Sequence, residues 1–122
     1  MNEYLVISTS IDLMRTASGN IVFISSDGNY SSFVFTNGDS RVITMQLGQV
    51  ERVLSEQLPH SGSDFIRIGK SLIINRNYIS YINIQKQQIV LSDGSSSSHS
   101  LTASREALKQ LKELVERDLK QH

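Results

Sequence analysis

The chain contains no cysteine, which excludes disulfide bonds and any zinc site built on thiolates. It also lacks a run of about 18 apolar residues, the length that a membrane-spanning helix needs. Its first residues, MNEYLVISTSID, show neither the basic start nor the apolar core of a signal peptide. We therefore expect a cytoplasmic protein with no membrane partner. The 122 residues are the length of one domain, which we expect to span residues 1–122.

Motifs of catalysis and of cofactor binding are lacking as well. The three histidines, His60, His99 and His122, fall in an expected loop, in a serine-rich segment and at the terminus, and no GxSxG element accompanies them. No group of histidines and carboxylates has the spacing of metal ligands. The glycine-containing turns match neither GxxxxGK[ST] nor GxGxxG. We expect no enzyme, no catalytic residue, no metal and no cofactor.

The sequence carries no net charge, with 12 basic and 12 acidic residues, and this argues against a strongly basic nucleic-acid-binding protein. The charge is unevenly distributed, however. Residues 1–63 hold three arginines and six carboxylates, whereas residues 64–105 hold five cationic and two acidic side chains, net charges of −3 and +3. A cationic half can attract an anionic partner although the whole molecule is neutral.

Short apolar or alternating segments, separated by turn residues, predict a mainly β fold. The turns Asp27-Gly28-Asn29 and Asn37-Gly38-Asp39 favour hairpins. The serine-rich segment 95–100 is either a flexible loop or a polar edge. The expected strands are residues 4–8, 11–15, 21–25, 30–36 and 41–45, two strands on either side of a turn near residues 69–71, and residues 79–84 and 88–92.

Two helices are expected. Residues 46–58 carry apolar side chains at spacings of three and four, and Pro59 ends this helix. A second helix starts after Ser104, a suitable N-cap, and places Leu108, Leu111 and Leu119 on one face. That face is either core or a contact with a partner, and the sequence leaves both readings open.

Three cations stand out in the cationic half. Lys70 lies in a turn of small residues that would hold a long side chain outward, and Arg76 lies in the next turn. Arg105 lies in the first turn of the second helix, where a cation is mildly unfavourable against the helix dipole. These residues are either solvated charges or contacts to phosphates and bases, and the residues alone do not separate the two.

Three segments resemble, in order and spacing, the hallmarks of the LytTR-type DNA-binding domain, the output domain of bacterial response regulators of the LytR/AgrA group. They are IVFISSDGNYSSFVFTNGD, FIRIGKSLIINRNYISYI, and LSDG followed by LTASREALKQL, and they span residues 21–111. The resemblance implies an elongated arrangement of small antiparallel sheets with one short helix mid-chain and a C-terminal helix. In this family, loops from the sheets rather than a recognition helix enter the major groove.

The resemblance also implies a function and its partners. It predicts a sequence-specific transcriptional regulator of a two-component system that binds double-stranded DNA at promoter repeats. It further predicts a homodimer on DNA and a sensor or receiver protein as a partner. The implied DNA-binding residues are Asn29, Tyr30, Lys70, Ser71, Lys86 and Arg105.

Individual roles follow from the family motifs. Tyr30 falls where the family has a groove-facing side chain, and Lys70 falls at the basic position that projects onto bases. Arg105 is the arginine of the motif that opens the last helix and would contact guanine in a bidentate manner, while Lys86 would touch a neighbouring phosphate.

Two positions depart from the pattern: Ile24 or Ser25 stands where the family has glutamate, and Gly69 stands where it has histidine. Together with the zero net charge, Gly69 supports an alternative function. The chain would then be a protein-interaction module or co-regulator on the same scaffold, without DNA binding.

Overall fold

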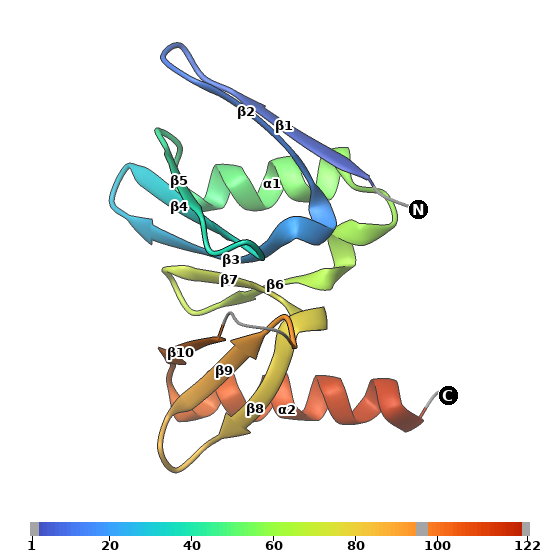
Figure 1. Ribbon diagram of the computed structural model, residues 1–122. Helices are drawn as coiled ribbons and strands as arrows, with labels where there is room; N and C mark the ends of the chain where they lie inside the picture. Colours follow the sequence, from blue (N-terminus) through green and yellow to red (C-terminus); the bar gives the residue numbers. More distant parts are fainter. Residues whose placement is uncertain (1–2, 95–97, 121–122) are drawn as a thin grey trace. The chain divides into compact units, whose positions relative to one another are not determined.

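The structure is a computed structural model that describes residues 3–94 and 98–120 (Figure 1). The chain forms two compact units, Met1–Asn77 and Tyr78–His122, here called the first and the second unit. The mainly β fold class, with small antiparallel sheets, one helix mid-chain and one C-terminal helix, is confirmed. Within the described residues, no helix is long and apolar enough to cross a membrane.

The first unit consists of two antiparallel sheets and one α-helix. A two-stranded ribbon has the order β1-β2, and a five-stranded sheet has the order β5-β4-β3-β7-β6. The elements are β1 (Tyr4–Ser8), β2 (Leu13–Ala17), η1 (Ser18–Asn20), β3 (Ile21–Asp27), β4 (Tyr30–Phe35), β5 (Ser40–Ile43), α1 (Leu47–Gln57), η2 (Ser61–Asp64), β6 (Phe65–Ile68) and β7 (Leu72–Asn75). The short helix η3 (Arg76–Tyr78) includes the last residues of the first unit and the first residue of the second.

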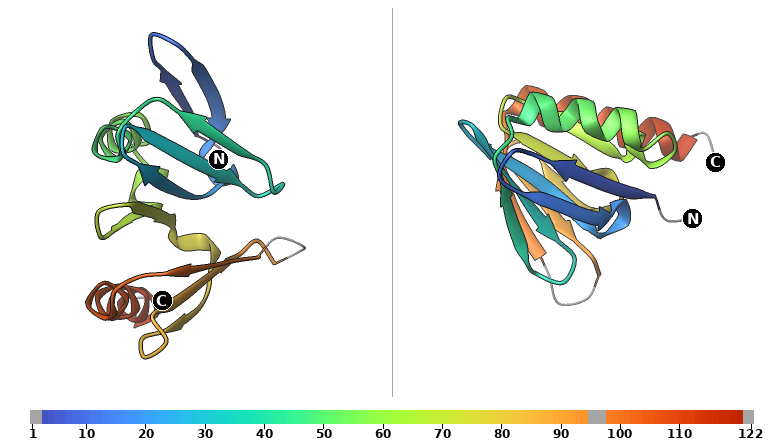
Figure 2. Two further views of the ribbon diagram at one scale, coloured as in Figure 1. Left: turned by 90° about the vertical axis from the view of Figure 1, so that its left-hand side faces the viewer. Right: turned by 90° about the horizontal axis from the view of Figure 1, so that it is seen from above.

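Helix α1 lies along one face of the five-stranded sheet (Figure 2). Its apolar positions Val50 and Leu54 belong to a buried cluster with Ile24, Phe33 and Ile73 from the sheet, and the inner face of the ribbon contributes further members. Each such side chain contributes roughly 1.5–3 kcal/mol when it leaves water. The helix therefore holds both sheets, and with them the turns that the strands carry.

The second unit is a three-stranded antiparallel sheet with one helix. Its elements are β8 (Ile79–Asn83), β9 (Gln88–Ser92), β10 (Ser98–Thr102) and α2 (Arg105–Lys120), and the sheet order is β10-β9-β8. Ile89 and Leu91 of β9 and Leu108 and Leu111 of α2 are buried. The apolar face of α2 is thus largely core, although Leu119 near its end remains exposed.

Most expected boundaries agree with the structure to within a few residues, the start of β2 differs, and residues 98–100 decide between the two readings of the serine-rich segment. Strand β2 begins at Leu13 rather than residue 11, because Thr9 closes a turn: its N–H donates to the carbonyl of Asp12 at 2.8 Å, and its hydroxyl accepts the N–H groups of Ile11 and Asp12. Residues 98–100 form part of the edge strand β10, as the polar-edge reading allowed. Residues 95–97 and His122 lie outside the described residues.

Candidate nucleic-acid interface

The turn between β3 and β4 presents the first two candidate residues. Gly28 has φ 62°, a left-handed conformation that glycine adopts without steric cost. Asn29 accepts a hydrogen bond on Oδ1 from Nε2 of Gln46 at 3.0 Å, which ties the turn to the residue before α1. Tyr30, the first residue of β4, is 51% exposed. An amide and a phenol are therefore held at the surface by a fixed turn.

The turn between β6 and β7 presents the next two. Gly69 has φ 64°, and Lys70 and Ser71 are exposed. The N–H of Ser26 on β3 donates to the carbonyl of Ser71 at 2.9 Å, so the turn is fastened to the neighbouring strand. Lys70 provides this turn with a cation that is free to extend into solvent.

The strand register brings these two turns to the same end of the five-stranded sheet. Ser25 of β3 pairs with Leu72 at the start of β7, and Asp27 of β3 pairs with Tyr30 at the start of β4. The β3–β4 turn and the β6–β7 turn therefore follow adjacent strand ends (Figure 1). Residues more than 40 positions apart in sequence share one surface, and Asp27 adds an exposed carboxylate there.

Arg67 holds the β6–β7 turn in place, a role that the sequence reasoning missed. Its Nε donates to the carbonyl of Gly69 at 3.1 Å and one terminal nitrogen donates to the carbonyl of Lys70 at 2.9 Å. The other terminal nitrogen forms an ion pair with Glu51 of α1 at 3.0 Å. A guanidinium can make all three contacts because its donors form a rigid, planar fork. The arginine two residues before Gly69 was the available signal.

The second unit brings Lys86 and Arg105 together. Lys86 lies in the β8–β9 turn, where its N–H donates to Oδ1 of Asn83 at 2.9 Å. The guanidinium of Arg105 donates to the carbonyl of Gln85, the residue before Lys86, at 3.3 Å. Both side chains are exposed. A cationic pair thus spans the turn and the start of α2.

Two further features fix this second group. Gln87 has φ 53°, and its carbonyl accepts the N–H of Ala103 at 3.2 Å, which docks the turn onto the segment before α2. Ser104 caps the helix as expected, because its hydroxyl accepts the N–H of Ala107 at 3.1 Å. The backbone of Arg105, the first residue of the helix, therefore has a well-defined position.

The six candidate residues therefore form two groups. Asn29, Tyr30, Lys70 and Ser71 lie in the first unit, and Lys86 and Arg105 lie in the second. Within the described ranges no group of histidines and carboxylates could hold a metal ion. What both groups offer is hydrogen-bond donors and positive charge on short turns, which suits phosphate oxygens and base edges.

The fold and these turns define a small β domain with cationic side chains presented by strand-connecting turns. A family model, the LytTr DNA-binding domain, matches residues 12–116, and the chain belongs to this family. The match runs through both units.

A solved structure has the same fold. It is the LytTr DNA-binding domain of a protein described as a methyl-accepting/DNA response regulator from Bacillus cereus. The TM-score is 0.62 at 16% sequence identity, over 93% of this chain and 96% of that chain. Among curated proteins, no match was found.

Proposed function

We propose that the protein is a sequence-specific transcriptional regulator that reads the major groove of DNA through its β turns. The observation that carries the proposal is the common position of the β3–β4 and β6–β7 turns at one sheet end. Tyr30 and Lys70 project there from turns that Gln46 and Arg67 fasten to the scaffold. Fixed donors of this kind give specificity, because little conformational entropy is lost on binding.

Each side chain has a proposed task. Tyr30 contacts a base edge or a thymine methyl, and Lys70 contacts a base or phosphate as a point charge. Arg105 donates its planar fork to guanine, and Lys86 neutralises a phosphate. Asn29 and Ser71 add hydrogen bonds beside these contacts. This function needs no catalysis. We propose that the protein acts in the cytoplasm of a bacterium, downstream of a sensor or receiver protein.

A binding-site selection tests the proposal. The full chain is incubated with a pool of duplexes that contain 20 randomised base pairs, and bound duplexes are sequenced after several rounds. We expect one motif to be enriched, and fluorescence anisotropy on it should give an affinity that falls steeply with salt. Each phosphate that the protein neutralises contributes about −0.9 to the slope of log K against log salt concentration, so the slope gives the number of phosphate contacts. Absence of an enriched motif, with binding that does not depend on salt, would instead favour a protein-interaction module.

The DNA complex is proposed to contain two copies of the chain. Sedimentation of the chain with a one-site and with a two-site duplex measures the stoichiometry directly. A 2:1 complex on the two-site duplex supports the proposal, and a strictly 1:1 complex on it would contradict it.

A further inference from the structure

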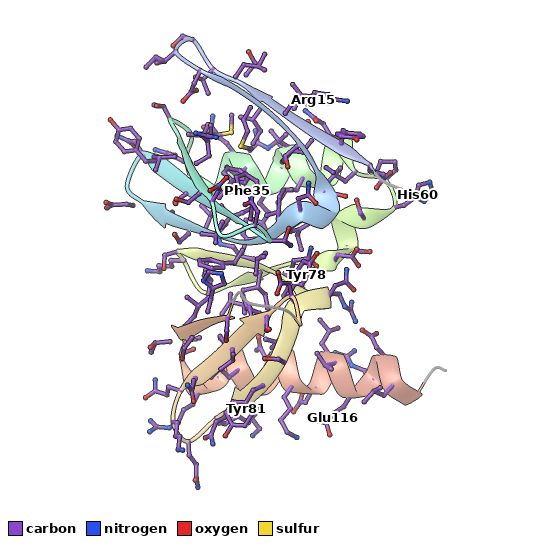
Figure 3. The ribbon with its side chains drawn as sticks, in the orientation of Figure 1. Arg15, Phe35, His60, Tyr78, Tyr81 and Glu116 are labelled. Atoms are coloured by element: carbon purple, nitrogen blue, oxygen red, sulfur yellow. The ribbon has the colours of Figure 1, made fainter. Side chains whose placement is uncertain are left out.

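A groove in the first unit plays no part in the proposed function. It has a volume of about 540 Å³ and lies between the β1–β2 ribbon and the β4–β5 hairpin. Leu13, Met14 and Arg15 of β2 line one side, and Phe35, Asp39 and Arg41 lie on the other. None of the six candidate DNA-binding residues is among its lining residues. Figure 3 labels Arg15 on the ribbon and Phe35 on the sheet.

The two outer edges of the ribbon differ. On β1, the amide of Gln57 occupies the edge, accepting the N–H of Val6 at 2.8 Å and donating to its carbonyl at 2.7 Å. These bonds show that the polar backbone groups of Val6 point away from β2. In an antiparallel pair, a residue and its direct partner either both face inward or both face outward.

It follows that β2 offers backbone groups to the groove. Arg15 pairs with Val6, so its N–H and carbonyl also point outward, and those of Leu13, two residues earlier, do the same. In the described part of the chain, β2 is paired with β1 alone. Such an edge is a template for another strand. The lining of the groove includes both Leu13 and Arg15.

The side chains of the groove combine apolar surface with a net positive charge. Leu13 is 67% exposed, and Met14 and Phe35 add apolar lining. Arg15 and Arg41 outnumber the carboxylate of Asp39, which accepts a hydrogen bond from Nδ2 of Asn37 at 3.0 Å. The guanidinium of Arg15 lies 4.1 Å from the centre of the Tyr4 ring, a cation–π contact.

We propose that this groove binds an extended peptide segment of a partner protein, which adds to β2 as a third strand and carries alternating apolar and acidic side chains. The backbone groups of Leu13 and Arg15 supply the strand hydrogen bonds. Apolar side chains on one face of the peptide pack on Met14 and Phe35, and carboxylates on its other face pair with Arg15, which lies on the opposite face of β2 from Met14.

A second copy of the chain fits the same edge less well. Antiparallel self-pairing centred on β2 would place Arg15 opposite its own copy, and like charges directly opposite each other destabilise a sheet. The charge of the groove therefore selects an acidic partner segment. The proposed peptide binding does not depend on DNA binding, so an experiment can refute one of these two functions and leave the other intact.

Nuclear magnetic resonance on the ¹⁵N-labelled full chain tests the proposal with a synthetic probe, acetyl-Thr-Val-Glu-Val-Glu-Thr-amide. We expect the largest shift changes at the backbone amides of Leu13 and Arg15. The matched peptide with lysine in place of glutamate should bind at least tenfold more weakly. A probe with N-methyl groups on its strand-bonding face should also lose its binding. Equal shifts with both charged peptides, or shifts confined to the β3–β4 and β6–β7 turns, would overturn the proposal.

Three variants sharpen the test. Arg15→Glu should reverse the preference toward the lysine peptide, whereas Arg52→Glu, an equal charge change on α1 outside the groove, should not. Leu13→Pro removes an N–H that points away from β1, so the hydrogen bonds between β1 and β2 remain. This variant should bind the glutamate peptide at least tenfold more weakly. If that variant unfolds, the N-methyl probe makes the same test on the unaltered chain. A free chain that dimerises in sedimentation, with Leu13→Pro abolishing the dimer, would assign the edge to a second copy and overturn the proposal.

Discussion

The guanidinium of Arg67 donates to the carbonyl of Lys70 at 2.9 Å, so the side chain of one cation fixes the backbone of the next. The side chain of Lys70 is itself exposed, and we propose that it contacts DNA. The two cations thus have different tasks although they stand three residues apart. Because Arg67 binds the backbone of the turn, Lys70 has a defined position although the residue before it is glycine.

Removal of the Arg67 clamp should weaken DNA binding more than it weakens the fold. Arg67→Ala frees the β6–β7 turn, which must then be ordered on binding at a cost of about 1 kcal/mol, or roughly fivefold in affinity. Fluorescence anisotropy against the selected duplex measures the loss. Urea denaturation should show a smaller change, because the ion pair with Glu51 is at the surface and surface pairs contribute about 0–1 kcal/mol.

Two variants separate the clamp from the charge. Arg67→Lys keeps the charge but has no planar fork, so its affinity should resemble that of Arg67→Ala. Glu51→Gln removes the ion pair and leaves both bonds to the turn carbonyls, so its affinity should not fall. Full recovery with Arg67→Lys would show that only the charge matters and would contradict the clamp.

Arg105 and Lys86 should differ in what their loss does to specificity. Arg105→Ala should relax the base preference at one position of the site by about 1–3 kcal/mol. Lys86→Ala should weaken all sequences alike and reduce the salt slope by about one phosphate contact. Anisotropy with duplexes that carry single base changes, at several salt concentrations, measures both effects.

The matched control is Lys112→Ala, on α2, where the lysine pairs with Glu116 at 3.0 Å on an exposed face. This variant should leave both specificity and salt slope unchanged. A uniform loss with Arg105→Ala, without relaxation at any base position, would reduce Arg105 to a phosphate contact.

We expect that position 69 requires glycine because of its backbone conformation and not because a side chain would lack space. A Cβ at this position meets no atom within 4 Å, yet φ is +64°. Gly69→Ala should therefore cost about 1–2 kcal/mol of unfolding free energy from backbone strain alone, and Gly69→Asn less, because asparagine tolerates this region. Gly19 has equal space and no positive φ, so Gly19→Ala is the control and should not destabilise. Equal stability of Gly69→Ala and the unaltered chain in urea denaturation would refute this reading.

Local chemistry made much of the fold predictable. The turns at Gly28 and Gly38 follow from residues that accept positive φ, and both glycines do so, with φ 62° and 88°. Helix α1 was expected at 46–58 and is observed as Leu47–Gln57, because a period of three and four is a strong signal and Pro59 limits it. Asn29, Lys70, Ser71 and Lys86 lie in turns as expected, and Tyr30 and Arg105 begin a strand and a helix. The DNA contacts of these residues stay predictions.

Features that depend on a partner strand or residue were less predictable. Serine favours turns, so the sequence left both a loop and a polar edge open for residues 95–100, and pairing with the preceding strand β9 makes Ser98–Thr102 a strand. Asn75 is a polar residue at the end of the otherwise apolar strand β7. It is buried, and its amide donates to the carbonyl of Ile21 at 2.9 Å, a contact 54 residues away. The common position of the two turns that carry Tyr30 and Lys70 likewise arises from the β3–β7 pairing, which no local pattern encodes.

The Glu3 carboxylate should make stability depend on pH in the acidic range. Ser61 donates to its Oε1 from both hydroxyl and backbone N–H at 2.6 Å, and the N–H of His60 adds a bond at 3.2 Å. These bonds, the Ser61 hydroxyl first, lower the pKa of Glu3 below its ordinary 4.5. A lowered pKa in the folded state gives stability that is present above the unfolded pKa and lost as the pH falls through the folded one.

Glu3→Gln should therefore be less stable than the unaltered chain at pH 7, and the gap should close as the pH falls below 4.5. Ser61→Ala removes the largest contribution to the lowered pKa, so it should show the same closing gap. The double variant should lose little more than either single one, because the two residues share one contact. Urea denaturation at pH 7, 5.5, 4.5 and 3.5 measures all four proteins. A gap that stays constant across this range would show that Glu3 acts by packing and not by its charge.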